Sequence, residues 1–290
     1  MRALGTAVDY LVLPAYMGGA LALTGGLVGA GLPSTLAIGA VMWTFALIAA
    51  VLERLRPERS DWNVLSQPLA TELAHYMFNY NLGYALGLGP LLAIGRLSGA
   101  FLPVLWPTSW PLVAQIVLAA FLGEMLSYWQ HRLVHRIPWL WRFHALHHSG
   151  ETLNLYRGAR FHFVDIGPAF VLLALPLFVL RAPETIVTYS AALCGTLGAI
   201  QHSNVRVRTP RGLDWILCTP EAHRLHHSRS RGESDANFGT TVTLLDRLFG
   251  TWLAPTAPVP EAVGIPNDST RPGFRAQFLD PFIPAARVSL

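Results

Sequence analysis

Six apolar stretches separated by polar or proline-containing segments dominate the sequence. They cover residues 10–30, 34–52, 73–95, 111–130, 166–180 and 185–202. A helix needs about 20 apolar residues to cross the hydrocarbon core of a membrane. The fifth stretch is shorter and contains Pro168 and Pro176, so we expect it to tilt or to be re-entrant. The pattern predicts an all-α integral membrane protein with about six hydrophobic helical segments.

The amino-acid composition also indicates a membrane protein. Hydrophobic residues make up 52% of the chain and charged residues 13%, whereas about 25% of the residues of an average soluble domain are charged. The net charge is +4, but the arginines lie beside the apolar stretches, where membrane topology explains them better than nucleic-acid binding does. Two cysteines, Cys194 and Cys218, provide no disulfide framework.

Arginine placement predicts the orientation of the chain in the membrane. Arg54, Arg56 and Arg59 follow the first two apolar stretches, and five more arginines lie within residues 131–165. Cytoplasmic loops are enriched in such residues, so we expect both regions and both termini in the cytoplasm. Every basic residue is arginine, which is typical of a GC-rich bacterial genome and indicates a bacterial inner membrane.

The same pattern divides the chain into three expected parts. Residues 1–110 would form a membrane hairpin and a third span, and residues 111–253 a histidine-rich catalytic region with spans four to six. Residues 254–290 are rich in proline and would form a cytoplasmic tail that wraps loosely over the histidine-rich region, with a disordered tail as the alternative.

Histidines are concentrated in the middle of the chain. Ten of the 11 lie within residues 131–227, and only His75 lies outside. The first two are four residues apart, a spacing that puts both rings on one face of a helix, and two HxxHH motifs follow. The ten are His131, His135, His144, His147, His148, His162, His202, His223, His226 and His227.

These ten imidazoles predict two metal ions at the end of the fourth span. Four ligands close a structural zinc site, and imidazole suits iron, zinc and copper. His162 or His202, taken alone, could instead be a hydrogen-bonded interface residue, and His75 is expected to be one. A zinc peptidase needs HExxH, but Arg132, Ala145 or Arg224 occupies the glutamate position, which argues against that class.

Glu124 is the one acidic residue in the fourth apolar stretch. It lies seven residues before His131, two helical turns away on the same face and about 10 Å deeper. A carboxylate inside a membrane usually faces a cavity or a partner. We expect Glu124 to hold a ligand ring or to line the substrate cavity, with direct metal ligation or a purely structural role as the alternatives. Other candidates to hold a ligand ring are Asp165, Asn204, Asp214, Asn237 and Asp246.

The motifs and their neighbouring residues resemble a known family. The histidines occur in YWQHRLVH, WRFHALHHS, QHSNV and TPEAHRLHHS, followed by NFG and LLDRLFGTW. Over roughly residues 120–253 the chain therefore resembles the fatty acid hydroxylase/sterol desaturase superfamily of integral-membrane di-iron oxygenases. The family commonly has an aspartate at the position of Glu124.

The resemblance implies the chemistry. Two iron ions would be the cofactor, with zinc as a substitute on overexpression, and O₂ would be the cosubstrate. A separate electron donor such as ferredoxin or cytochrome b5, with a reductase, would supply electrons, because the sequence contains no heme, flavin or GxGxxG motif. The substrate would be a membrane lipid. Hydroxylation is the favoured reaction, and desaturation on the same di-iron site is the alternative.

Two other function classes remain open. A non-enzymatic metal-binding or transport protein would carry ligands near the middle of the bilayer, whereas these histidines cluster at helix ends and in polar loops. A membrane zinc hydrolase would need a general base and no oxygen. An assay without oxygen separates a hydrolase from an oxygenase.

Reporter fusions test the predicted topology. A reporter fused after Leu290 or placed at Arg56 should be cytoplasmic, and one at Pro33 or Pro103 should lie outside, because the arginines mark the cytoplasmic side. Paired alkaline phosphatase and fluorescent-protein fusions measure this. An external location for the loop around His148 would contradict it.

Overall fold

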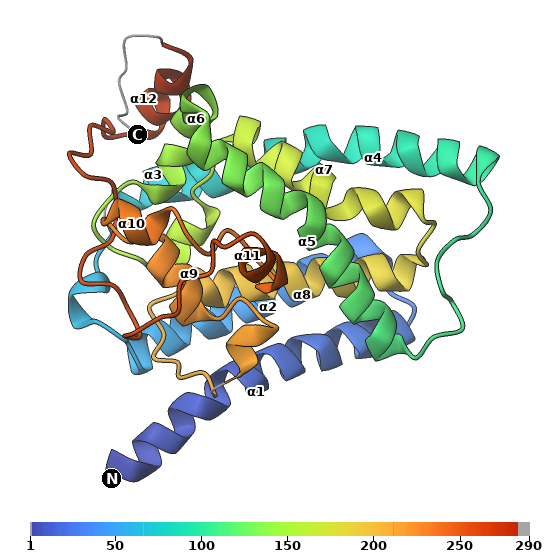
Figure 1. Ribbon diagram of the computed structural model, residues 1–290, viewed down its shortest axis with the longest axis horizontal. Coiled ribbons are helices and arrows are strands. Elements are labelled where there is room, and N and C mark those ends of the chain that lie inside the picture. Colours follow the sequence, from blue (N-terminus) through green and yellow to red (C-terminus); the bar gives the residue numbers. More distant parts are fainter. Residues whose placement is uncertain (1, 66, 211, 284–290) are drawn as a thin grey trace.

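The computed structural model describes residues 2–65, 67–210 and 212–283, and this part of the chain is helical, with isolated bridges but no strand. Figure 1 shows long helices running lengthwise and short helices gathered near one end. The long helices are α1 (Arg2–Gly29), α2 (Ser34–Leu55), α4 (Asn81–Phe101), α5 (Leu112–Arg136), α7 (Phe163–Val179) and α8 (Glu184–His202). The short helices are α3 (Leu69–Ala74), α6 (Pro138–His148), α9 (Pro220–His226), α10 (Arg231–Ser234), α11 (Leu244–Leu248) and α12 (Phe274–Leu279).

Prolines set where several of the long helices begin. Pro33, Pro111 and Pro183 directly precede α2, α5 and α8, and Pro138 is the first residue of α6. Proline is tolerated there because the first N–H groups of a helix lack intrahelical partners. A π-helical stretch, His75–Tyr80, joins α3 and α4 into one continuous apolar helix.

In the part of the chain that the structure describes, four helices are long and apolar enough to cross a membrane, which confirms the predicted all-α integral membrane class. They are Ala7–Gly29, Ser34–Leu55, Leu69–Phe101 and Leu112–Arg136, and the apolar α7 is shorter, with 17 residues. The sixth predicted segment, α8, is a helix but lies inside the bundle against α1, α2 and α5. Its buried Thr188, Ser190 and Thr196 make it less apolar than α1 and α2.

Small residues bring α4 and α7 into close contact. The two helices run side by side in Figure 1, and a Cβ atom on Gly83 would lie 2.5 Å from Ile166 Cγ2 and 3.1 Å from Gly167 N. A second core joins α1, α2 and α8 around Leu13, Phe45 and Ile200. The helices are thereby fixed relative to one another, and so are the ends of α5 and α8 that carry histidines.

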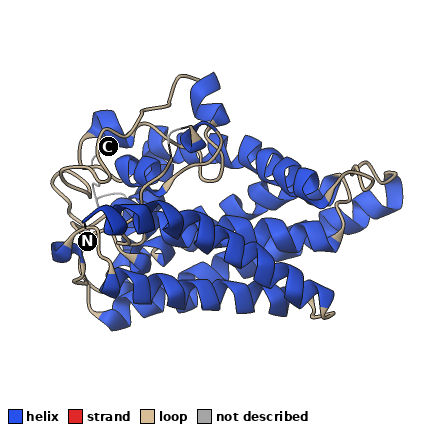
Figure 2. Cartoon of the chain, turned by 90° about the horizontal axis from the view of Figure 1, so that it is seen from below, coloured by secondary structure: helices blue, strands red, loops and turns tan. Residues whose placement is uncertain are grey.

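The segment after α8 folds back over one end of the bundle, the end where both termini lie in Figure 2. Its last part, residues 254–283, is attached by specific bonds. Gly264 N donates to His227 O at 3.1 Å, Gln277 Oε1 pairs with His75 Nε2 at 2.8 Å, and Asp268 accepts from Gly150 N at 2.8 Å. His75 therefore has protein partners, as expected for an interfacial histidine.

Substitution of Gly83 should separate close packing from helix propensity. Gly83→Ala should lower the midpoint of thermal unfolding, because overpacking costs about 1–3 kcal/mol and outweighs the gain in helix propensity of about 1 kcal/mol. Gly99→Ala is the matched control in the same helix, since a Cβ there has nothing within 4 Å, and its midpoint should stay or rise. Equal upward shifts for both variants would show that α4 and α7 are not in close contact.

Candidate metal centre

Nine of the ten predicted ligands converge in two buried groups. The ligand atoms within each group all lie within 4.8 Å of one another. The first group is His131, His135, His144, His148 and His226, and the second is His147, His202, His223 and His227. Helices α5, α6, α8 and α9 supply all of these rings except His227, which directly follows α9.

Adjacent histidines are divided between the groups. His147 belongs to the second group and His148 to the first, while His226 belongs to the first and His227 to the second. Neighbouring side chains on a helix diverge by about 100°, so each HxxHH motif reaches both groups. The rings of His148 and His227 stack across the boundary with their centroids 4.4 Å apart, which places the groups next to each other.

Short distances between ring nitrogens define each group. In the first group, His131 Nε2 lies 3.0 Å from His226 Nε2, and His144 Nε2 lies 3.1 Å from His148 Nε2. In the second group, His202 Nε2 lies 3.0 Å from His147 Nε2 and 2.9 Å from His223 Nε2.

Backbone carbonyls fix the protonation of several rings. His131 Nδ1 lies 2.7 Å from Phe238 O, and His226 Nδ1 lies 2.8 Å from Ala236 O. A carbonyl oxygen only accepts, so both Nδ1 atoms carry hydrogen and, in neutral rings, both Nε2 atoms present lone pairs. Two lone pairs 3.0 Å apart cannot form a hydrogen bond with each other. The carbonyl of Gly198 imposes the same state on His202, with Nδ1 2.7 Å away.

Protonation is not a favourable way to relieve this contact. Burial, and then the neighbouring His131, hold the pKa of His226 well below its usual 6.5. Burial likewise lowers the pKa of His147, His148 and His227. A cation between the lone pairs removes the repulsion without protonating any ring.

The donor set fits a transition metal. Among the described residues, the buried His135 Nε2 has no hydrogen-bond partner, while the other nitrogen of that ring faces Asp235. Buried polar atoms normally have a partner, so a bound metal ion would account for a ring left in this state. Groups of five and four imidazoles suit iron, zinc or copper.

Asp165 is the one predicted carboxylate that holds a histidine of the two groups. Its Oδ2 lies 2.8 Å from His144 Nδ1, and both side chains are buried. Such a bond sets the tautomer and orientation of a metal-binding ring. Sequence reasoning missed Asp235, whose Oδ1 lies 3.8 Å from His135 Nδ1, and it missed the carbonyls of Phe238, Ala236 and Gly198.

Glu124 contacts the backbone. Its carboxylate accepts from Thr240 N at 2.9 Å and from Thr241 N at 2.6 Å, and within the described part of the chain no hydrogen bond to a histidine accompanies them. These bonds match the structural alternative, and a role in lining the cavity stays a prediction. Glu124 thus positions the loop that continues from Phe238, whose carbonyl accepts from His131. Of the other candidates, Asp246 accepts from Phe238 N and Gly239 N, while Asp214 contacts Arg247. Asn237 and Asn204 also bond outside the histidine groups.

His162 lies outside both groups. Its Nε2 lies 3.1 Å from Phe278 O, and its Nδ1 accepts from Val164 N at the start of α7. Both ring nitrogens therefore have protein partners. The ligand role predicted for His162 stays a prediction that these contacts do not support. The sequence alone could not separate His162 from His202, because both are isolated histidines.

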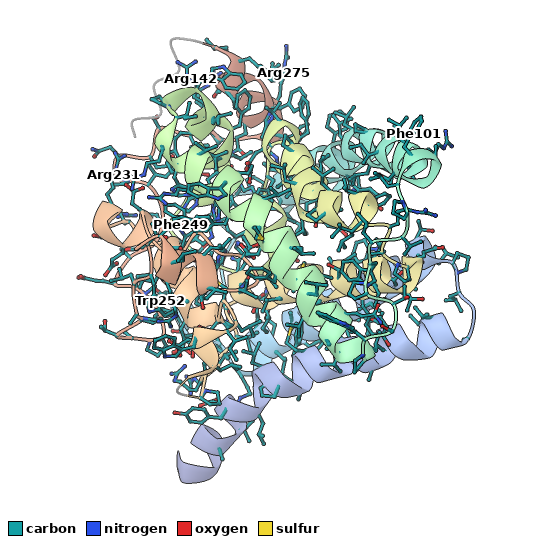
Figure 3. The ribbon with its side chains drawn as sticks, turned by 45° about the vertical axis from the view of Figure 1, so that its right-hand side comes forward. Phe101, Arg142, Arg231, Phe249, Trp252 and Arg275 are labelled. Carbon is teal, nitrogen blue, oxygen red and sulfur yellow. The ribbon has the colours of Figure 1, made fainter. Side chains whose placement is uncertain are left out.

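A cavity of about 80 Å³ reaches the first group from the polar end of the molecule. His135, His148 and Trp141 form part of its wall together with Arg231 and Asp235. Figure 3 shows Arg231 at the edge of the molecule, where its side chain is half exposed. The cavity connects the buried histidines to a charged surface.

Comparison with known proteins agrees with this arrangement. A family model described as fatty acid hydroxylase matches residues 116–251, which include both histidine groups. The chain is 34% identical to ornithine lipid hydroxylase OlsE of Rhizobium tropici over 241 residues, 81% of this chain and 72% of that protein. The chain belongs to the fatty acid hydroxylase family. It is therefore an oxidoreductase, and the resemblance seen in the motifs is confirmed.

More distant relatives match a smaller region. The chain is 31% identical to alkylglycerol monooxygenase of Homo sapiens over 162 residues, 55% of this chain and 35% of that protein. It thus spans about a third of that relative. No solved structure matches the chain.

Asp165 should control metal affinity through His144. Asp165→Ala should weaken metal binding about 10–100-fold, the usual cost of losing a partner that orients a ligand, whereas Asp165→Asn keeps an acceptor oxygen and should lose less. Competition with a chromophoric chelator on metal-free protein measures the dissociation constant. Asp214→Ala is the control, because Asp214 contacts Arg247 instead of a histidine. Unchanged affinity in Asp165→Ala would contradict the assignment.

Proposed function

We propose that this chain is a membrane di-iron oxygenase that hydroxylates a C–H bond of a membrane lipid with O₂ and electrons from a separate donor. The observation that carries the proposal is the pairing of buried imidazole lone pairs within two adjacent groups. Membership of the fatty acid hydroxylase family supports iron as the metal.

Bound iron would supply oxygen activation and hydrogen abstraction from an unreactive C–H bond, a chemistry that side chains alone do not provide. The overall reaction converts C–H, O₂, two electrons and two protons into C–OH and water. The protein must therefore exclude bulk water from the rings and still admit electrons and protons.

The residues of this chain perform the binding and positioning. His131, His144 and His226 are each oriented through Nδ1, by Phe238 O, Asp165 and Ala236 O. All nine rings are at most 6% exposed, so the lone pairs are kept from water. The charged cavity beside His135 and His148 is the proposed route for water and protons between the polar surface and the first group.

The substrate class follows from the membrane setting and the relatives. Four apolar spans hold the site at one end of the bundle, where one end of a membrane lipid can approach it. The two relatives are named for ornithine lipid hydroxylation and alkylglycerol monooxygenation. We propose a membrane lipid as substrate, a cytoplasmic site, and a small carrier such as ferredoxin or cytochrome b5, with its reductase, as donor.

Desaturation is the second candidate reaction, because it also begins with hydrogen abstraction. The names of the relatives favour oxygen insertion. Metal transport and zinc hydrolysis are less consistent with membership of an oxidoreductase family.

Comparative lipidomics tests the reaction. Cells that express the gene aerobically should contain lipids with the mass of one added oxygen, and cells lacking it should not. Loss of two hydrogens instead would indicate desaturation. Product formation without oxygen would exclude an oxygenase.

Alanine variants test the ligand set. Anaerobically purified protein should contain two metal ions per chain, with zinc able to replace iron on overexpression. His147→Ala, His148→Ala, His226→Ala and His227→Ala should each lose activity and metal, because each removes a ligand from one group. Elemental analysis and oxygen-dependent turnover measure the two effects.

Two further variants serve as controls. His75→Ala should retain most metal and activity, since His75 pairs with Gln277. Glu124→Gln should keep the metal with lowered turnover, because Glu124 holds only the loop behind His131. A fully active, metal-replete His147→Ala protein would contradict the di-iron proposal.

A further inference from the structure

An exposed apolar patch lies on the polar half of the molecule, outside the four spans. We call it the α11 patch, and it consists of Trp215, Ile216, Leu244, Leu248 and Phe249. Leu248 is 70% exposed, Ile216 65% and Trp215 63%. Contiguous apolar surface of this kind marks a site for a protein partner or a membrane.

Contacts within the protein hold the residues of the α11 patch in place. Thr243 Oγ1 donates to Asp214 O at 2.7 Å, and Leu217 forms a bridge with Val242, which ties the two parts of the patch together. The guanidinium of Arg247 lies between the rings of Trp215 and Trp252, at 3.9 and 4.2 Å from their centroids. Its apolar side chains are thus held at the surface.

The α11 patch continues the outward-facing side of α5. Next to the patch, the exposed apolar residues Met125, Trp129 and Leu133 follow one another four apart and form a stripe along one side of the helix, with a drift of about 40° per step. Phe249 of the patch contacts Trp129 of the stripe with ring centroids 4.7 Å apart. Figure 1 shows α11 between α9 and α5. Because α5 is a span, its exposed stripe faces lipid, and the α11 patch extends this lipid-facing surface.

The position of Trp129 places this junction at the edge of the membrane. From Leu112 to Trp129 is 18 residues, and a helix needs about 20 to cross the hydrocarbon core. Tryptophan is enriched at this boundary. Arg132 lies over the Trp129 ring at 5.5 Å. Arginine side chains at a membrane surface bury their methylene groups against apolar residues and keep the guanidinium in the headgroup layer.

We propose that the α11 patch is seated in the headgroup–acyl boundary of the bilayer, as a second, non-spanning membrane contact. The patch would contact lipid directly and not a protein partner. Arg132 flanks the patch beside Trp129 and suits anionic headgroups.

The contact bears on the metal centre through Asp246. This residue lies within α11, between the exposed Leu244 and Leu248, and accepts from Phe238 N at 2.8 Å and Gly239 N at 2.7 Å. Phe238 O in turn lies 2.7 Å from His131 Nδ1. The proposed membrane contact would therefore fix the loop that orients His131. It would also turn the histidine groups toward the lipid surface.

Depth-dependent fluorescence quenching tests the proposal. Leu248→Cys is labelled with bimane in the full chain and reconstituted into vesicles of phosphatidylcholine and phosphatidylglycerol, with Cys194 and Cys218 replaced by alanine. Two controls, Val117→Cys and Glu261→Cys, use the same label. Val117 is exposed in the first half of the span α5, and Glu261 is exposed on the polar end. The quenchers are a phosphatidylcholine with a nitroxide near the headgroup and aqueous iodide.

The label at Leu248 should lose most of its fluorescence to the lipid quencher and little to iodide, whereas the label at Glu261 should behave in the opposite way. Strong iodide quenching at Leu248, equal to that at Glu261, would overturn the proposal. Protection from both quenchers would also overturn it, because a protein partner or a second copy would then cover the α11 patch.

Discussion

The contact between imidazole lone pairs inside a closed helical bundle is the interaction on which the rest of this structure depends. Rings such as His131 and His226 donate from Nδ1 to carbonyl oxygens, and their Nε2 atoms then meet at 3.0 Å. Burial of polar atoms without partners is costly. A bound cation would offset this cost, so we expect metal binding and the packing of α5, α6, α8 and α9 to stabilise each other.

The polar half of the chain positions the carbonyl oxygens of Ala236 and Phe238. The segment from Ala236 to Val242 is held by the buried side chains of Asp246, Asn237 and Glu124. Asn237 adopts a positive φ of 54° and bonds to Ala222 O and Leu253 O, which directs the chain past α9. Glu124 anchors the far end of the segment from within α5. The hydrogen bonds of this carboxylate thus support backbone geometry.

Much of the fold and of the ligand set could be predicted from sequence, because histidine spacing and apolar length are local properties. The assignment of His147 and His148 to different groups follows from the 100° step of a helix. The carbonyl contacts could not be predicted, since any residue can supply a carbonyl oxygen. The isolated His162 was indistinguishable from a ligand until its contacts with Phe278 O and Val164 N were seen. The interior position of α8 depends on tertiary packing that hydropathy alone does not reveal.

The central claim is that the two histidine groups are two metal centres. Metal-edge anomalous diffraction from crystals of the iron-loaded protein tests it most directly. Two anomalous peaks at the iron edge should appear, one enclosed by His131, His135, His144, His148 and His226 and the other by His147, His202, His223 and His227. A single peak, or a peak coordinated by His162 or Glu124, would contradict the account.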